Sequence, residues 1–251
     1  MRIISLVPSV TETLFELGLD DQIVAVTRWC NRPANKVTNK PKIGGTKNPK
    51  LESIVEFKPD LVILDRDENR KEDADDLQRR GIRTFTVFPK TIQDSIELIR
   101  NFGEMFSVEN HSKIMTEEIE HRLETQRPAH TYASLILIWR APYMTINSDT
   151  YVHAASNLFG FRNCFADHQQ RYPAITPTEI AQINPDVVLF PDEPYPFRKK
   201  HIEAFKQEFP DLSATLHNRM LFFDGSYIAW HGFGMLRALR EFPVVIASQL
   251  L

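Results

Sequence analysis

The chain has 251 residues, of which 42% are hydrophobic and 25% charged, a composition typical of a globular protein rather than a disordered one. Lysine and arginine number 30 against 33 aspartates and glutamates, a net charge of −3, so no nucleic-acid-binding surface is expected. No apolar run reaches the roughly 18 residues that a membrane-spanning helix requires.

The N-terminal segment gives the first indication of cellular location. Residues 1–7 are apolar except for Arg2 and Ser5, and Pro8 ends the run. The run is too short for a signal-peptide core and lacks a small-residue cleavage site after it. As written, the product is expected to stay in the cytoplasm; if a leader was removed, it would be periplasmic or at the cell surface. The two cysteines, Cys30 and Cys164, lie far apart, which argues against a disulfide framework or a zinc site.

The first 107 residues alternate short apolar runs with amphipathic segments, which predicts parallel βαβ structure. The expected elements are a strand at 3–7, a helix from Ser9 or Thr11 to Leu17, a strand at 23–26, a helix at 49–57, strands at 61–64 and 82–88, and a helix after Thr91. Residues 65–76 are charged except for Asn69 and Ala74, so we expect an exposed loop leading into a helix.

Residues 108–127 are a polar segment that predicts one long helix. Neither glycine nor proline interrupts it before Pro128, and its apolar positions recur at helical spacing. These positions are Val108, Met115, Ile119 and Leu123. A helix of about 20 residues is about 30 Å long. We therefore expect it to connect an N-terminal lobe, residues 1–107, to a C-terminal lobe, residues 128–251.

Similar sequence lies on both sides of this helix. Residues 51–64 and 177–190 align at an offset of 126 residues. The identical pairs are Ile54/Ile180, Pro59/Pro185, Asp60/Asp186 and Val62/Val188. We interpret this repeat as two similar lobes. A single domain in which two Pro-Asp turns coincide by chance is the alternative.

The second half repeats the alternation of strands and helices. The expected elements are a strand at 134–139, a helix at 150–159, a helix opened by the capping box of Thr176 and Glu179, a strand at 187–190, a helix at 198–209, a strand at 220–223 and a last helix from about Gly232 that kinks at Pro243.

In open parallel sheets, ligands bind beyond the carboxyl ends of the strands. The sequence places aromatic and basic side chains there in both halves. The candidates are Arg28, Trp29, Trp139, Arg140, Tyr143, Tyr172, Trp230 and His231. Flat side chains facing a cleft suit a large, partly apolar ligand that a few polar groups orient. For any single aromatic residue, packing against its own loop is the alternative.

The common catalytic and nucleotide-binding motifs are absent, so we expect no catalytic residues and no dedicated metal site. Two residues keep other chemistry open. His231, in the loop before the last helix, suits a metal ligand or a hydrogen-bond donor. Cys30 suits a soft metal ligand, although a lone cysteine is more often a small buried residue. An enzyme that uses Cys30 or His231 on a small substrate is therefore the alternative function.

Several motifs resemble the helical-backbone metal receptor family, the class III substrate-binding proteins of ABC importers for vitamin B12, iron-siderophores and haem. The motifs are residues 2–12, the Leu14-Phe-Glu-Leu-Gly18 that follows, Gly44-Gly45 with Asn48-Pro49, and Phe57-Lys-Pro-Asp-Leu-Val-Ile63. Residues 29–33 resemble a segment of the vitamin B12-binding branch that supplies an aromatic side chain to the corrinoid.

The resemblance implies an α/β fold of two Rossmann-like lobes with parallel sheets, joined by a single long helix. It implies that a ligand (cobalamin, haem or a ferric siderophore) is clamped between the lobes without being chemically changed, and that no cofactor is needed. By position, Trp29 would stack on the ligand from the first lobe. Trp139, Tyr143 and Tyr172 would line the second lobe, and the loop of Trp230 and His231 would close one side.

The resemblance also implies docking to an ABC permease through an acidic residue at the tip of each lobe, and a monomer. Glu72 or Glu68 and Glu193 or Asp192 are the nearest candidates. One departure concerns the loop before the last helix. The family usually has Arg-Pro-Gly-Pro-Arg there, whereas this chain has the sequence Trp230-His-Gly-Phe-Gly234. A further alternative is a scaffold protein whose acidic segment 65–76 docks a basic partner.

Overall fold

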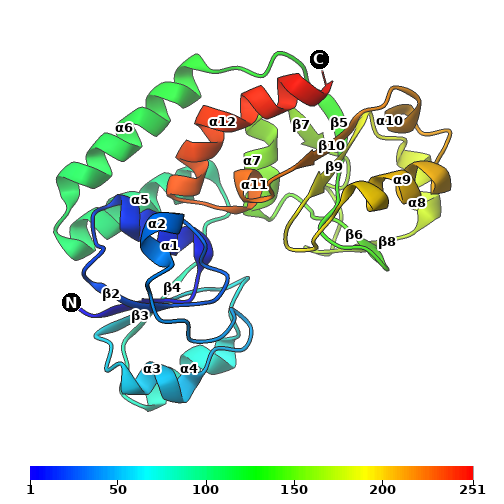
Figure 1. Cartoon of the computed structure of the whole chain (residues 1–251). Coiled ribbons are helices and arrows are strands. Elements are labelled where there is room, and N and C mark those ends of the chain that lie inside the picture. The colour runs from blue at the N-terminus through cyan, green and yellow to red at the C-terminus, as the bar shows by residue number, and fades with distance from the viewer. Residues whose placement is uncertain (251) are drawn as a thin grey trace. The chain divides into compact units, whose positions relative to one another are not determined.

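The computed structural model describes residues 1–250, which form two units, each built on its own four-stranded parallel sheet (Figure 1). Unit 1 consists of Met1–Pro89, Gln93–Glu118 and Trp230–Gly234. Unit 2 consists of Lys90–Ile92, Ile119–Ala229 and the chain from Met235 onward. The predicted α/β class with two parallel sheets is confirmed.

The sheet of unit 1 has the strand order β2-β1-β3-β4, with all neighbours parallel. Its strands are β1 (Ile3–Ser5), β2 (Ile23–Val26), β3 (Leu61–Asp65) and β4 (Thr84–Val87). Figure 1 shows helices on both faces of this sheet. One face carries α1 (Pro8–Glu16) and α5 (Ile92–Phe106), and the other carries α3 (Leu51–Glu56) and α4 (Lys71–Arg79). The short helix α2 (Ala34–Val37) lies between β2 and α3 in the chain.

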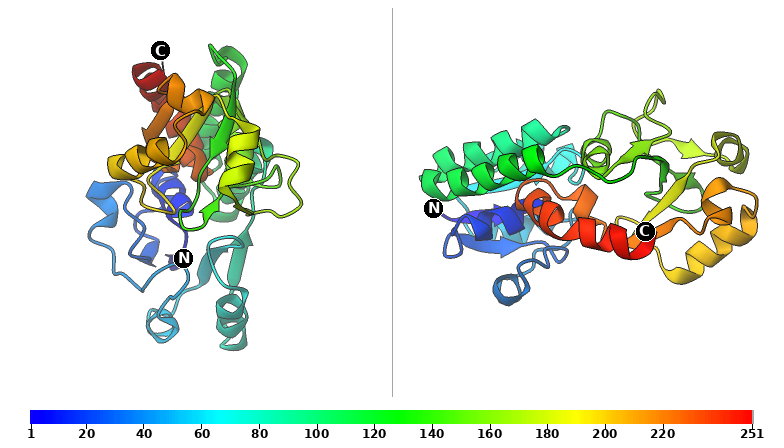
Figure 2. Two further views of the ribbon diagram at one scale, coloured as in Figure 1. Left: turned by 90° about the vertical axis from the view of Figure 1, so that its right-hand side faces the viewer. Right: turned by 90° about the horizontal axis from the view of Figure 1, so that it is seen from above.

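Helices α5 and α6 (Glu109–Thr125) form a hairpin in which they lie side by side (Figure 2). The turn uses Ser107 at φ 56°, and the Val108 amide donates to the carbonyl of Gly103 at 2.8 Å. A Cβ on Gly103 would lie 2.0 Å from Ser112 Oγ, so only glycine permits this close approach. Helix α6 is the long helix predicted at 108–127; its residues up to Glu118 belong to unit 1, and those from Ile119 belong to unit 2.

The sheet of unit 2 has the order β10-β9-β5-β7, again with all neighbours parallel. Its strands are β5 (Tyr132–Ile136), β7 (Phe161–Asn163), β9 (Val187–Pro191) and β10 (Met220–Phe223). Helices α7 (Tyr151–Leu158), α11 (Ser226–Ala229) and α12 (Phe233–Leu250) cover one face, and α8 (Pro177–Ile183), α9 (Lys199–Glu208) and α10 (Ser213–Leu216) cover the other (Figure 1). The small antiparallel pair β6 (Tyr143–Met144) and β8 (Ala174–Ile175) was not predicted.

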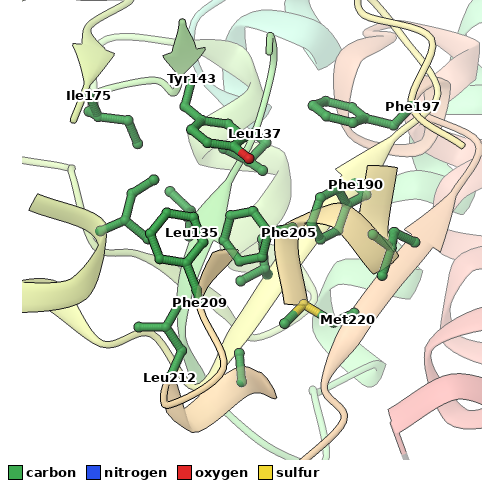
Figure 3. Close-up of a cluster of buried hydrophobic side chains, with 14 of the residues drawn as sticks. Leu135, Leu137, Tyr143, Ile175, Phe190, Phe197, Phe205, Phe209, Leu212 and Met220 are labelled. Atoms are coloured by element: carbon green, nitrogen blue, oxygen red, sulfur yellow. The ribbon is translucent and has the colours of Figure 1, made fainter. Parts of the chain in front are cut away.

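A cluster of aromatic side chains fills the space between this sheet and α9 (Figure 3). The ring of Phe205, on α9, is fully buried and meets Phe190 of β9 edge-on, with centroids 5.4 Å apart. Tyr143 meets the same ring edge-on at 5.7 Å, and Phe209 lies 4.6 Å from it. Edge-to-face pairs of this kind add to the stabilisation from burial alone, so α9 is anchored mainly through Phe205.

The internal repeat corresponds to the same local structure in each unit. Asp60 exchanges two hydrogen bonds with Arg2: its amide donates to the Arg2 carbonyl, and its carboxylate accepts from the Arg2 amide at 2.6 Å. Asp186 makes the same pair of bonds with Ala133, at 2.8 and 2.9 Å. Lys58 and Asn184 precede these turns, also 126 residues apart, and both have positive φ. Each Pro-Asp turn therefore ties one strand to the start of its neighbour.

Two local predictions need correction. Segment 65–76 is not wholly exposed, because Asp65 and Asp73 are buried. Asp65 Oδ1 accepts hydrogen bonds from the amides of Asp67 and Glu68, and Asp73 is paired with Arg70, so each buried carboxylate is compensated. The strand predicted at 134–139 ends at Ile136, where β5 gives way to the loop that carries Trp139.

Candidate functional site

Segment 230–234 belongs to unit 1, although it follows most of unit 2 in the chain. The amide of Gly232 donates to Ser95 Oγ of α5 at 2.7 Å, and the amide of Phe233 donates to Thr13 Oγ1 of α1 at 3.0 Å. Gly232 has φ 68°, and a Cβ there would lie 2.2 Å from Thr13 Oγ1. The lobe boundaries expected from the sequence are contiguous and do not assign segment 230–234 to the first lobe. The side-chain hydrogen bonds that hold this segment in unit 1 leave no local pattern in the sequence.

At the carboxyl end of β2, Trp29 is the most exposed aromatic residue of the candidate set, at 57%. The guanidinium of Arg28 lies 5.3 Å from the centre of its ring, within the range of a cation–π contact. The Arg28 amide donates to the carbonyl of Gly44 at 2.8 Å. A Cβ on Gly45 would lie 3.2 Å from both side chains, so the glycine pair of the sequence motif gives them room.

Trp230 is placed differently from Trp29, because it is only 4% exposed. The guanidinium of Arg32 covers its ring at 5.4 Å. Arg32 is not among the predicted site residues. No sequence pattern around Arg32 predicts its contact with Trp230, which lies far from it in the chain. We conclude that Trp230 is mainly a packing residue of unit 1, whereas Trp29 presents its indole ring to solvent.

His231 is also buried, and it contacts two side chains through the same ring nitrogen. Nε2 lies 3.2 Å from Ser9 Oγ and 3.4 Å from Asp65 Oδ2. In a Ser-His-Asp triad the serine and the carboxylate occupy opposite nitrogens of the imidazole. The contacts of His231 therefore join segment 230–234 to α1 and to the end of β3. They do not form a triad in which His231 would activate Ser9 as a nucleophile.

Cys30 is 2% exposed, and its sulfur lies 3.1 Å from Thr11 Oγ1 and 3.2 Å from Thr27 Oγ1. Burial raises the pKa of the Cys30 thiol, and the hydrogen bonds from the two threonines offset only part of that effect. A protonated, enclosed thiol is a poor nucleophile and a poor metal ligand. Its role in the structure is that of a small buried residue.

In unit 2, the loop after β5 presents Trp139, which is 43% exposed. Its ring meets Tyr195, from the loop after β9, edge-on with centroids 5.2 Å apart. On a neighbouring loop, Tyr172 is 38% exposed, and the guanidinium of Arg171 lies 5.3 Å from its ring. Tyr195 is not in the predicted set of side chains, although it lies in the proline-rich loop that the strand-end rule singles out.

Arg140 and Tyr143 form one polar group beneath this surface. The Tyr143 hydroxyl donates to Glu208 Oε2 at 2.9 Å, and burial together with this carboxylate raises the pKa of Tyr143 to about 12. Hydrogen bonds from the Arg140 guanidinium to Tyr143 and Tyr195 raise the pKa of Arg140. Tyr143 is only 8% exposed, so it fixes Arg140 in place and does not present its own ring.

Further positive charge lies at the start of α9. Arg198, Lys199 and Lys200 are exposed, and His201 follows them. The pKa of His201 is lowered, first by desolvation and then by the charges of Arg140, Lys200 and Arg198. The strand-end surface of unit 2 thus combines exposed aromatic rings with basic groups.

The two predicted docking carboxylates differ in exposure. Glu72 is exposed in the first turn of α4, beside Arg70. Glu193 is half-buried, and its Cγ would lie 2.6 Å from a Cβ placed on Gly225. The side chain of Glu193, in the loop after β9, is therefore packed against Gly225 in the loop after β10, while that of Glu72 projects from a helix.

Within residues 1–250, no group of three or more histidine, cysteine, aspartate or glutamate side chains is arranged to hold a metal ion. None of the helices in this range has the length and apolar character needed to cross a bilayer. The candidate surface in each unit includes aromatic rings and guanidinium groups, which suit stacking and hydrogen bonding to a ligand.

Comparison with known proteins gives consistent results. A family described as periplasmic binding protein matches residues 3–219. The ABC transporter substrate-binding lipoprotein YvrC of Bacillus subtilis (strain 168) is 27% identical over 255 residues, which cover 96% of this chain and 78% of the relative. The vitamin B12-binding protein of Pectobacterium atrosepticum is 24% identical over 197 residues, which cover 75% of this chain and 70% of that protein.

Among solved structures, the periplasmic heme-binding protein RhuT from Roseiflexus sp. RS-1, in its apo form, superimposes with a TM-score of 0.82. The two sequences are 20% identical, and the superposition covers 100% of this chain and 99% of that one. This similarity shows a common fold. Since these relatives are described as periplasmic or as a lipoprotein, the cytoplasmic location expected from the sequence gains no support.

Proposed function

Because the chain belongs to the periplasmic binding protein family, as its N-terminal motifs predicted, we propose that it is a non-enzymatic binding protein for a bulky chelated-metal ligand. The ligand class comprises cobalamin-like corrinoids, haem and ferric siderophores. The proposed place of action is outside the cytoplasmic membrane, where the relatives are named as periplasmic proteins or as a lipoprotein.

The observation that carries the proposal is the exposure of large aromatic rings at the strand ends of each unit. Trp29 and Trp139 are 57% and 43% exposed, and Tyr172 is 38% exposed. Tryptophan and tyrosine side chains have only two rotatable bonds, so they lose little conformational entropy when a flat ligand covers their rings. Arginine lies over the ring of Trp29 and over that of Tyr172, which favours ligands that carry carboxylates or other anionic groups.

The site residues divide into two proposed roles. Arg28, Trp29, Trp139, Arg140 and Tyr172 are proposed to touch the ligand. Tyr143, Trp230 and His231 are proposed to position the loops around them, because each is 8% exposed or less.

A titration that follows tryptophan fluorescence tests the ligand class. Cobalamin, haem and a ferric siderophore are each added to the intact chain, and one of them is expected to quench the emission saturably at micromolar concentration. Trp139→Ala and Trp29→Ala are expected to weaken that ligand at least tenfold, because central aromatic residues of binding sites contribute about 2 kcal/mol or more. Ile114→Ala is the control, since Ile114 is also a large exposed apolar residue, at 68%, but lies on α6. Absence of saturable quenching by all three ligands would reject the ligand class.

The proposed partner is an ABC permease, which Glu72 and Glu193 are proposed to contact. Glu72→Lys is expected to lower uptake by cells that contain the permease, while ligand affinity in solution stays unchanged. Asp75→Lys, on the same helix, is the matched control. Equal loss of uptake in both variants would point to the general charge of α4 instead of a docking residue.

The alternative of an enzyme that uses Cys30 or His231 has less support. Both side chains are 5% exposed or less, and the sulfur of Cys30 lies against the hydroxyl groups of Thr11 and Thr27. Catalysis by Cys30 would require a route for substrate and a partner that removes the thiol proton.

A further inference from the structure

Unit 2 contains a cavity of about 470 Å³ at the amino ends of its strands, the side of the sheet away from the aromatic loops. It lies beside Tyr132, the first residue of β5, and beside Phe159, which precedes β7. The last turns of α6 and α12 complete its wall. Its volume falls within the range of about 300–1,000 Å³ typical of small-molecule sites.

The floor of the cavity is apolar. Leu239 and Phe159 are 3% and 8% exposed, and Leu123, Leu158 and Ile246 are half-buried around them. Phe159 is held by Phe242 of α12, with the two rings edge-on at 4.9 Å. Such a floor matches a hydrocarbon chain and offers no hydrogen bond to a polar molecule.

The mouth of the cavity is basic. Arg127 and His130 line it, and among its lining residues within the described chain none carries a carboxylate. The guanidinium of Arg219 lies 5.4 Å from the ring of Tyr132, which also lines the cavity. Positive charge at one end of an apolar cavity is complementary to a ligand that has an anionic head and an apolar tail.

Arg127 has donors available for such a head group. Its hydrogen bonds to the carbonyls of Leu123 and Gln126 both use Nη1. Within residues 1–250, Nε and Nη2 of Arg127 are left to bind a carboxylate, and a guanidinium group can bind a carboxylate through two parallel hydrogen bonds.

The loop that carries the basic groups is held in place. A Cβ on Gly160 would lie 2.1 Å from the carbonyl oxygen of His130 and 3.0 Å from Pro128, so the loop packs directly against this glycine. The amide of Tyr132 donates to the carbonyl of Gly160 at 2.8 Å. A preformed mouth reduces the entropy lost when a ligand binds.

From these observations we infer that the cavity binds a free long-chain carboxylate, with its head at Arg127 and His130 and its chain along Leu123, Phe159 and Leu239. This site is separate from the strand-end surface and does not depend on the ligand proposed there.

Isothermal titration of the intact chain with dodecanoate, below its micellar concentration, tests the inference. Saturable binding is expected, about fourfold tighter for each methylene added from octanoate onward until the cavity is full. Dodecyltrimethylammonium has the same chain with a cationic head and is expected to bind at least tenfold more weakly. Equal binding of the two amphiphiles, or no saturable binding of dodecanoate, would overturn the inference.

Variants locate the site. Arg127→Gln is expected to weaken dodecanoate about tenfold, because the charged hydrogen bonds are lost. Arg83→Gln, an exposed arginine of unit 1, is the matched control and is expected to have no effect. Ala247→Trp, which fills the cavity from α12, is expected to abolish binding, with its urea midpoint measured to show that it folds. Undiminished binding by Ala247→Trp, or binding to phosphatidylglycerol vesicles without binding to dodecanoate, would refute the proposed ligand and site.

Discussion

Replacing Phe205 by alanine tests whether the aromatic cluster stabilises unit 2 as its geometry indicates. Phe205 is fully buried and has three aromatic neighbours, with ring centroids 4.6 to 5.7 Å away. Phe→Ala substitutions in protein cores lower the free energy of unfolding by about 3–5 kcal/mol. We expect a value near the upper end, since each edge-to-face pair contributes about 0.5–1.5 kcal/mol beyond burial.

Urea unfolding followed by the fluorescence of Trp139, the tryptophan of unit 2, measures this loss. With an m-value of roughly 1–3 kcal/mol/M, a loss of about 3–5 kcal/mol is expected to lower the midpoint by about 1–5 M. Phe222→Ala is the control, because Phe222 packs against the same cluster but is only partly buried. A loss below about 1.5 kcal/mol for Phe205→Ala, or one no larger than that of the control, would refute the assigned role of the cluster.

Three further predictions follow from local contacts. Gly232→Ala is expected to destabilise unit 1 more than Gly81→Ala in thermal unfolding, because both have positive φ but only Gly232 has a hydroxyl 2.2 Å from the added Cβ. Gln249→Ala is expected to speed hydrogen exchange of the Phe222 amide, since the Gln249 amide bonds the Phe222 backbone at 3.1 and 2.9 Å along edge strand β10. Burial lowers the pKa of His153 in the folded chain, so the unfolded chain takes up a proton first as the pH drops. The free energy of unfolding is therefore expected to fall as the pH drops through about 6.5. In urea unfolding at several pH values, His153→Gln is expected to reduce this dependence of the free energy of unfolding on pH.

Local sequence patterns predicted the secondary structure well where they had a single physical meaning. Thr176 and Glu179 form the capping box that their spacing indicated. The long polar helix occupies Glu109–Thr125, because its apolar positions and the absence of glycine and proline favour no other structure. Pro243 lies inside α12, which continues to Leu250, as expected for a last helix that contains this proline.

The candidate site was predictable in part. Trp29 and Trp139 are exposed at strand ends, where the parallel-sheet rule places ligand-contacting side chains. The same rule gave Tyr143 and Trp230, which are buried. Tyr143 packs against Phe205 and Phe209, and Arg32 covers the ring of Trp230. No local pattern reveals these contacts.

By itself, the sequence determined the α/β class, the family and the repeated Pro-Asp turn, because periodicity, motifs and paired turns are local properties of the chain. Only the tertiary structure decided which candidate rings face solvent, that segment 230–234 packs into unit 1, and that the amino ends of the unit 2 strands enclose an apolar cavity with a basic mouth. Burial and cavity shape arise from contacts between residues far apart in the chain, such as Phe159 and Phe242, and spacing along the sequence does not encode them.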